Sequence, residues 1–72
     1  MKTVNLIEYA DEMVMSVRSF TDTTTGNKKA EQCFSRIVKE SDPSLDEEEI
    51  ENCIEEGYYE NNGYQLFIVH ST

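Results

Sequence analysis

The side chains best suited to nucleophilic or proton-transfer chemistry in this chain are Cys33, Cys53 and His70. A thiol nucleophile needs a base within hydrogen-bonding distance, and usually a further group that orients the base. Both cysteines fall on the apolar stripes of expected helices, where a free cysteine behaves as a small hydrophobic residue. We therefore predict that the protein is not an enzyme and has no catalytic residue.

Metal and cofactor binding are also disfavoured by the spacing of the polar residues. Zinc sites use three or four Cys, His or carboxylate ligands at set spacings, and the chain has one His and two Cys. The acidic run at residues 46–49 lacks the alternating ligands and the glycine of a calcium-binding loop. Residues 23–29 place a lysine after a glycine, but the first glycine of a phosphate-binding loop is missing. We expect neither a metal nor a cofactor.

The acidic residues are concentrated in one half of the chain, which has a net charge of −9. All six Lys and Arg residues lie within residues 1–39, whereas ten of the 15 Asp and Glu residues lie within residues 40–72. Such an asymmetry indicates the chemistry of a partner rather than the fold. It argues against direct binding of nucleic acid, because phosphate groups need Lys and Arg to neutralise them.

The acidic half includes an expected helix over residues 45–56, whose outer face carries the carboxylates. We predict that this face binds the basic surface of a partner protein. Tyrosines beside it offer contact area with little conformational entropy to lose, although cross-strand packing in the hairpin is the preferred explanation for them. A face kept charged for solubility is the other interpretation. The candidate partner-binding residues are Asp46, Glu47, Glu48, Glu51, Glu55, Glu56, Tyr58 and Tyr59.

Two alternative functions follow from other features. The composition resembles that of small acidic inhibitors encoded by phages and mobile elements, anti-CRISPR proteins among them. The resemblance lies in composition, and it implies that the carboxylates imitate the phosphates of a nucleic acid. The second alternative is a homo-oligomeric structural protein, because the expected strand over residues 64–71 is apolar on both faces.

Two helices are expected from apolar spacing. Residues 28–40 have apolar side chains at the i, i+3, i+4, i+7 and i+8 positions of a surface helix, preceded by a polar loop in which Thr25 or Asn27 caps the helix. Ser44 followed three residues later by Glu47 has the pattern of a capping box for the second helix. Gly57 supplies the left-handed residue that ends it.

The strands are expected on either side of this helix pair. Residues 13–20 alternate in the manner of a strand, and Asn62-Gly63 predicts a tight hairpin between residues 58–60 and 64–71. Residues 1–12 fit a helix or a strand equally well. We therefore predict one small α+β domain over residues 1–72, with the order β-α-α-β-β. Its sheet is antiparallel and three-stranded, with residues 64–71 in the middle and two helices on one face.

The remaining expectations concern surroundings and assembly. No apolar stretch is long enough for a transmembrane helix, and no secretory signal is recognisable, so we expect a cytoplasmic protein with reduced cysteines and no membrane contact. The second apolar face of residues 64–71 needs a cover, because large apolar patches are rarely exposed on soluble monomers. Either residues 1–12 fold across it, or a second copy forms a homodimer.

Overall fold

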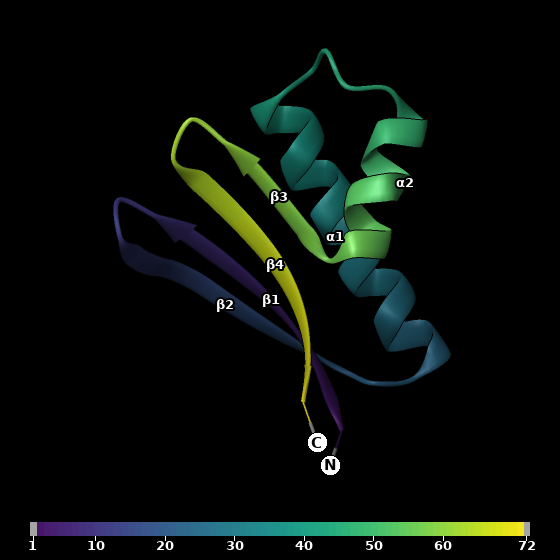
Figure 1. Ribbon diagram of the computed structural model, residues 1–72. Helices are drawn as coiled ribbons and strands as arrows, with labels where there is room; N and C mark the ends of the chain where they lie inside the picture. Colours follow the sequence, from purple (N-terminus) through teal and green to yellow (C-terminus); the bar gives the residue numbers. More distant parts are fainter. Residues whose placement is uncertain (1, 72) are drawn as a thin grey trace.

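The computed structural model describes residues 2–71, which form one four-stranded antiparallel sheet with two helices on one face (Figure 1). The strand order across the sheet is β2-β1-β4-β3, and Thr3 of β1 is paired with Ser71 of β4. The predicted α+β class is therefore confirmed. In chain order the elements are β1 (Thr3–Ala10), β2 (Met13–Thr21), α1 (Thr24–Ser41), α2 (Glu47–Glu56), β3 (Tyr58–Asn61) and β4 (Tyr64–Ser71).

The prediction of three strands and of the order β-α-α-β-β is wrong, because the N-terminal segment is a strand inside the sheet and the observed order is β-β-α-α-β-β. β1 pairs with β2 on one side and with β4 on the other. A two-residue turn joins β1 to β2, and both of its residues, Asp11 and Glu12, have positive φ angles of 53° and 63°. Because β1 joins the sheet, the N-terminal segment does not cover the face of the sheet opposite the helices.

The C-terminal hairpin agrees with its prediction. Asn62 and Gly63 have φ angles of 49° and 83°, the left-handed conformation that a two-residue hairpin turn requires. β4 lies between β1 and β3, so it is an interior strand as expected. Leu66 and Ile68 face the helices, whereas Phe67 faces the opposite side of the sheet.

α1 begins earlier than predicted, because part of the expected loop is helical. The cap is Thr23, whose hydroxyl oxygen accepts a hydrogen bond from the Gly26 backbone N–H at 3.0 Å. Gly26 is buried in the first turn of the helix, against the end of β2. A β-carbon at this position would lie 1.8 Å from the Thr21 carbonyl oxygen. The close approach of α1 to the sheet therefore requires glycine at this position.

The cap of α2 is also different from the predicted one. A carboxylate oxygen of Asp46 accepts a hydrogen bond from the Glu49 backbone N–H at 2.8 Å. Leu45 precedes this cap and packs against the core cluster that contains Ile50, so the two residues form a hydrophobic staple. Capping by Ser44 would lose this apolar contact. Gly57 ends the helix with a φ of 73°, as predicted.

The core lies between the helices and one face of the sheet. α1 crosses β1 and β2, and α2 lies beside α1 and next to β3. The buried apolar side chains come from both layers. They are Val4, Leu6, Tyr59 and Leu66 from the sheet and Ala30, Phe34, Val38 and Ile50 from the helices.

Candidate interaction surface

The carboxylates of α2 point away from the core in three directions. Ile50 is buried and Ile54 is half-buried, so they define the inner side of the helix. At 100° per residue, Glu48 and Glu55 lie on the opposite, outermost side. Both are exposed, and they are separated by about two helical turns. They form the centre of the predicted partner-binding face.

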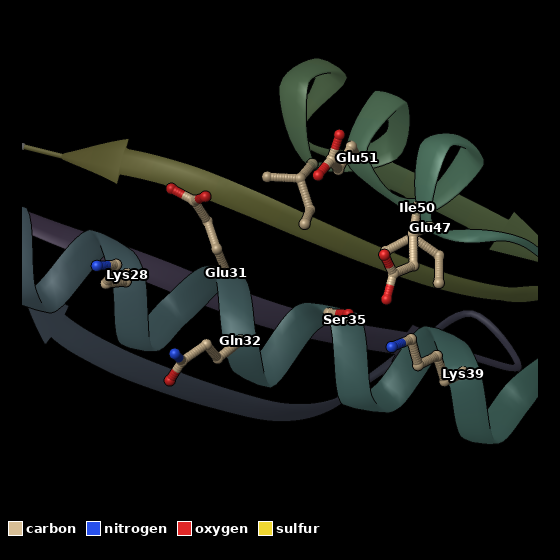
Figure 2. Close-up of a pocket in the computed structure, with 9 residues that line it drawn as sticks. Lys28, Glu31, Gln32, Ser35, Lys39, Glu47, Ile50 and Glu51 are labelled. Carbon is tan, nitrogen blue, oxygen red and sulfur yellow. The ribbon is translucent and has the colours of Figure 1, made fainter.

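One flank of α2 faces α1 across a groove of about 360 Å³ (Figure 2). Glu47 and Glu51 line the groove from α2, and Lys28 and Lys39 line it from α1. Ile50 forms part of the apolar wall. The basic residues of the first half of the chain therefore lower the negative potential on this flank, although none of them forms an ion pair with α2 in residues 2–71.

The other flank faces β3 across a hollow of about 420 Å³. Its lining contains four carboxylates and two tyrosines but no lysine or arginine. Together with the outermost glutamates of α2, these four carboxylates make up what we call the acidic surface. The acidic surface consists of Asp42, Glu48, Glu49, Glu55, Glu56 and Glu60.

The remaining predicted contact residues differ in how much surface they can offer a partner. Asp46 is exposed, but its carboxylate caps α2. Tyr59 is 5% exposed and belongs to the core. Tyr58 lies on the opposite face of β3, where its ring contacts Phe67 with 5.1 Å between centroids and its hydroxyl donates a hydrogen bond to Glu60. Both tyrosines border the hollow, and of the two Tyr58 has more surface to offer a partner.

Hydrogen bonding keeps one carboxylate of the acidic surface ionised. Glu60 accepts hydrogen bonds from the Tyr58 hydroxyl and from Gln65 Nε2, the latter at 3.1 Å. These two bonds lower the pKa of Glu60 below its ordinary value. Sequence reasoning placed Glu60 in the hairpin and missed it as a member of this surface. The sequence feature that could have identified Glu60 is its pairing with Gln65. This pairing follows from the hairpin register once the turn is placed at Asn62-Gly63.

The two cysteines are free thiols inside the helix layer, where they pack against the core cluster but are half-buried rather than fully buried. Cys33 Sγ accepts a hydrogen bond from Arg18 Nη1 at 3.0 Å. Burial, with Glu56 and Glu49 nearby, raises the pKa of Cys53, so this thiol stays protonated at neutral pH. His70 lies at another place in the fold. The structure therefore brings no histidine base to either thiol within residues 2–71.

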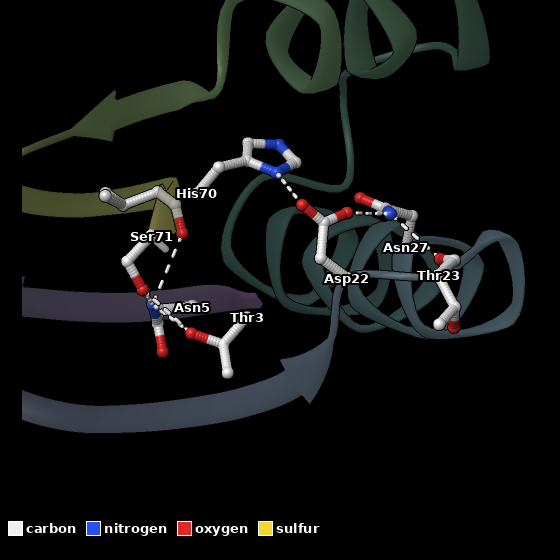
Figure 3. Close-up of polar contacts among 8 residues, drawn as sticks. Thr3, Asn5, Asp22, Thr23, Asn27, His70 and Ser71 are labelled. Carbon is white, nitrogen blue, oxygen red and sulfur yellow. Dashed lines mark hydrogen bonds and ion pairs between the residues drawn. The ribbon is translucent and has the colours of Figure 1, made fainter. Parts of the chain in front are cut away.

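His70 has a structural partner that the sequence did not reveal (Figure 3). Its Nδ1 lies 3.5 Å from a carboxylate oxygen of Asp22, and Asn27 Nδ2 donates a hydrogen bond to the same carboxylate at 2.7 Å. The bond from Asn27, helped by His70, lowers the pKa of Asp22. This cluster ties the end of β4 to the junction of β2 and α1. No linear pattern joins these three positions.

Among residues 2–71, no three His, Cys, Asp or Glu side chains are grouped closely enough to hold a metal ion. No helix in the same range is sufficiently long and apolar to span a membrane.

Comparisons with protein-family models, with curated proteins and with solved structures found no match to this chain. Fold and surface define the molecule as a small α+β domain with a helix-covered sheet and a strongly acidic second helix.

Proposed function

We propose that this protein is a non-enzymatic interaction domain that binds a basic protein surface through its acidic surface. The observation that carries the proposal is a set of six carboxylates on and beside α2 that have no ion-pair partner in residues 2–71. Isolated surface charges are ordinary, but a one-sign patch creates a potential that attracts an oppositely charged partner and speeds its association.

The placement of these charges is unfavourable for the isolated domain. Glu55 and Glu56 lie in the last turn of α2, where the helix dipole favours positive charge, and that turn has no basic residue. Glu51 and Glu55 repel each other at the i, i+4 spacing, by a few tenths of a kcal/mol. A partner that supplies Lys or Arg relieves both penalties. Solubility alone is equally served by mixed charges, which carry neither penalty.

The shape of the surface favours a macromolecular partner over a small substrate. The groove beside α1 and the hollow beside β3 lie on either side of α2, so the helix forms a ridge between two depressions. Glu48 and Glu55 lie on the crest of this ridge. A protein surface with separated basic side chains fits a ridge, whereas small ligands are usually enclosed in a concave pocket.

The proposal is tested by capture of proteins from source-cell lysate on the immobilised chain. The test variant is Glu48→Gln/Glu55→Gln, with Glu48→Lys/Glu55→Lys as its stronger form. The matched control is Asp11→Asn/Glu12→Gln, which removes the same charge from the β1–β2 turn at positions with positive φ. Circular dichroism establishes that all variants fold.

We expect wild type and control to retain a defined basic protein that elutes at moderate salt, because screening shortens the Debye length. The test variant should elute it earlier, and the lysine variant should not retain it. Equal retention by all variants would contradict the proposal. Adding duplex DNA during elution then identifies whether the partner's basic surface is one that also binds nucleic acid.

A further inference from the structure

The face of the sheet opposite the helices carries an apolar row across all four strands. Val17 of β2 is paired with Ile7 of β1, Ile7 with Phe67 of β4, and Phe67 with Tyr58 of β3. The four side chains share one face because directly paired residues project to the same side of a sheet. We call this side the free face, since neither helix covers it.

Further apolar side chains extend the row on both sides. Tyr9 and its partner Val14 follow on one side, and Val69 lies on the other. Val14, Val17 and Val69 are 57%, 55% and 42% exposed. Soluble monomers seldom leave a contiguous apolar patch of this kind open to water.

The free face is almost free of charge in a strongly acidic chain. Among the strand residues that project from it, Glu60 at the β3 corner is the one ionisable carboxylate, and no lysine or arginine is present. The acidic ridge of α2 lies on the other side of the sheet. Two copies that approach through their free faces therefore keep the carboxylates of α2 pointing away from each other, and Glu60, on the edge strand β3, is the one member of the acidic surface that projects from this face.

Several polar side chains at one end of the free face are already hydrogen-bonded within the sheet (Figure 3). Asn5 Nδ2 donates to Ser71 Oγ at 3.0 Å, and Ser19 Oγ donates to Asn5 Oδ1 at 2.7 Å. The hydroxyls of Thr3 and Ser71 are 2.8 Å apart. Burial of these groups against another surface costs little, because the penalty falls on polar groups that lose their partners.

We propose that the free face is the interface of a homodimer, occupied by the free face of a second copy of this chain. Strand spacings of about 4.8 Å and rises of about 3.3 Å per residue give the face about 450 Å² in projection. Two corrugated faces together bury about 1,000 Å², the lower limit of a specific interface. Face-to-face packing of two sheets is a standard arrangement, with about 10 Å between layers.

Other occupants match the face less well. An anionic lipid surface repels a chain of net charge −9, and the free face has no Lys or Arg to offset that repulsion. A partner that binds through ionic contacts is also a poor match, because the free face offers it a single carboxylate. A second copy needs no charge match and presents the same apolar row, which is the self-complementarity that a two-fold interface requires.

The test is sedimentation equilibrium of the full chain over a range of concentrations. Wild type should show a reversible dimer with twice the 8.3 kDa mass of one chain. Val17→Lys, and independently Val69→Lys, should abolish the dimer, because each places an unpaired charge in the buried interface. The matched control is Met13→Lys, since Met13 is 67% exposed on the same strand but projects to the helix side, opposite Ala10.

Each outcome decides the proposal once circular dichroism shows native structure. A monomeric wild type at the highest attainable concentration would overturn it, whether or not the chain binds vesicles or another protein. A dimer that survives both free-face variants would overturn it as well. Loss of the dimer in Met13→Lys as well as Val17→Lys would assign the contact to the edge of β2 rather than to the free face.

Discussion

The two faces of the sheet are built from the same strands, but they differ in what covers them. On the helix side, Leu6 and Leu66 are 1% and 0% exposed beneath α1 and α2. On the free face, Val17 and Val69 are about half exposed although they are equally apolar. Apolar character alone therefore does not determine which of these residues are buried. Within one chain, burial depends on which face of the sheet the helices cover.

The apolar residues on the two faces of the sheet therefore have different roles. Side chains under the helices stabilise the monomer, because their removal opens cavities that close packing does not refill. Side chains on the free face contribute less to the monomer and are available for association. Substitutions on the two faces should therefore produce effects of different size and different kind.

The largest expected effect follows from a matched pair of phenylalanines. Phe34 is fully buried between α1 and the sheet, so Phe34→Ala should lower the free energy of unfolding by about 3–5 kcal/mol. Phe67→Ala on the half-buried free face should lower it by about 1 kcal/mol. Urea unfolding at low protein concentration, where the chain is monomeric, measures both. Equal losses would show that the two faces do not differ as described.

The next largest effect concerns how the helix layer is seated on the sheet. Gly26→Ala places a β-carbon against the Thr21 carbonyl oxygen, so α1 has to move away from the sheet. We expect a loss of about 2–3 kcal/mol in thermal or urea unfolding. Thr25→Ala, at the exposed neighbouring position, is the control and should cost less than about 0.5 kcal/mol. A neutral Gly26→Ala would mean that the contact is not tight.

A smaller effect distinguishes the observed cap of α2 from the predicted one. Asp46→Ala removes the bond to the Glu49 N–H and should cost about 1 kcal/mol, whereas Asp46→Asn should retain most of the stability. Ser44→Ala should cost less than Asp46→Ala, because the Ser44 hydroxyl donates a hydrogen bond to Asp42 and caps no helix. A larger loss of stability for Ser44→Ala than for Asp46→Ala in urea unfolding would instead support Ser44 as the cap of α2, as the sequence predicted.

The smallest effect separates two tyrosines on opposite faces. Burial on the helix side, with Glu8 nearby, raises the pKa of Tyr64 to about 12. On the free face, the hydrogen bond to Glu60 is the main cause that raises the pKa of Tyr58. Glu60→Gln should therefore return Tyr58 towards its ordinary pKa and leave Tyr64 unchanged in a phenolate absorbance titration. A shift of Tyr64 instead would reverse the assignment.

The same titration has a consequence for stability. The pKa of Tyr64 is higher in the folded chain than its ordinary value of 10.0. Its contribution to stability is therefore fully present below pH 10 and is lost as the pH rises towards about 12. Tyr64→Phe should remove this part of the alkaline destabilisation.

Much of the fold was predictable because it depends on local patterns. The apolar stripe of α1, the Asn62-Gly63 hairpin and the end of α2 at Gly57 each depend on residues that are close together in the sequence. β1 was ambiguous because its short apolar run has no decisive period. Its turn at Asp11 and Glu12 also contains no glycine to mark the left-handed conformation that both residues adopt.

The parts that were not predictable depend on contacts between distant residues. Gly26 is in an apparent loop sequence, and its burial follows from the approach of Thr21. The choice of Asp46 over Ser44 follows from the packing of Leu45 against the core. For the surface, the acidic helix was predictable from the sequence. The groove wall formed by α1 and the carboxylates beside β3 were not, because they depend on how distant elements pack together.

The most direct test of the contrast between the faces is solvent exposure of valine methyl groups at low and high protein concentration. Paramagnetic relaxation from a soluble probe measures this exposure for Val14, Val17 and Val69 by NMR. The proposed dimer predicts that all three valines lose exposure as the protein concentration rises, while Met13 and the α2 glutamates remain accessible. Unchanged exposure of the valines, or protection centred on α2, would contradict it.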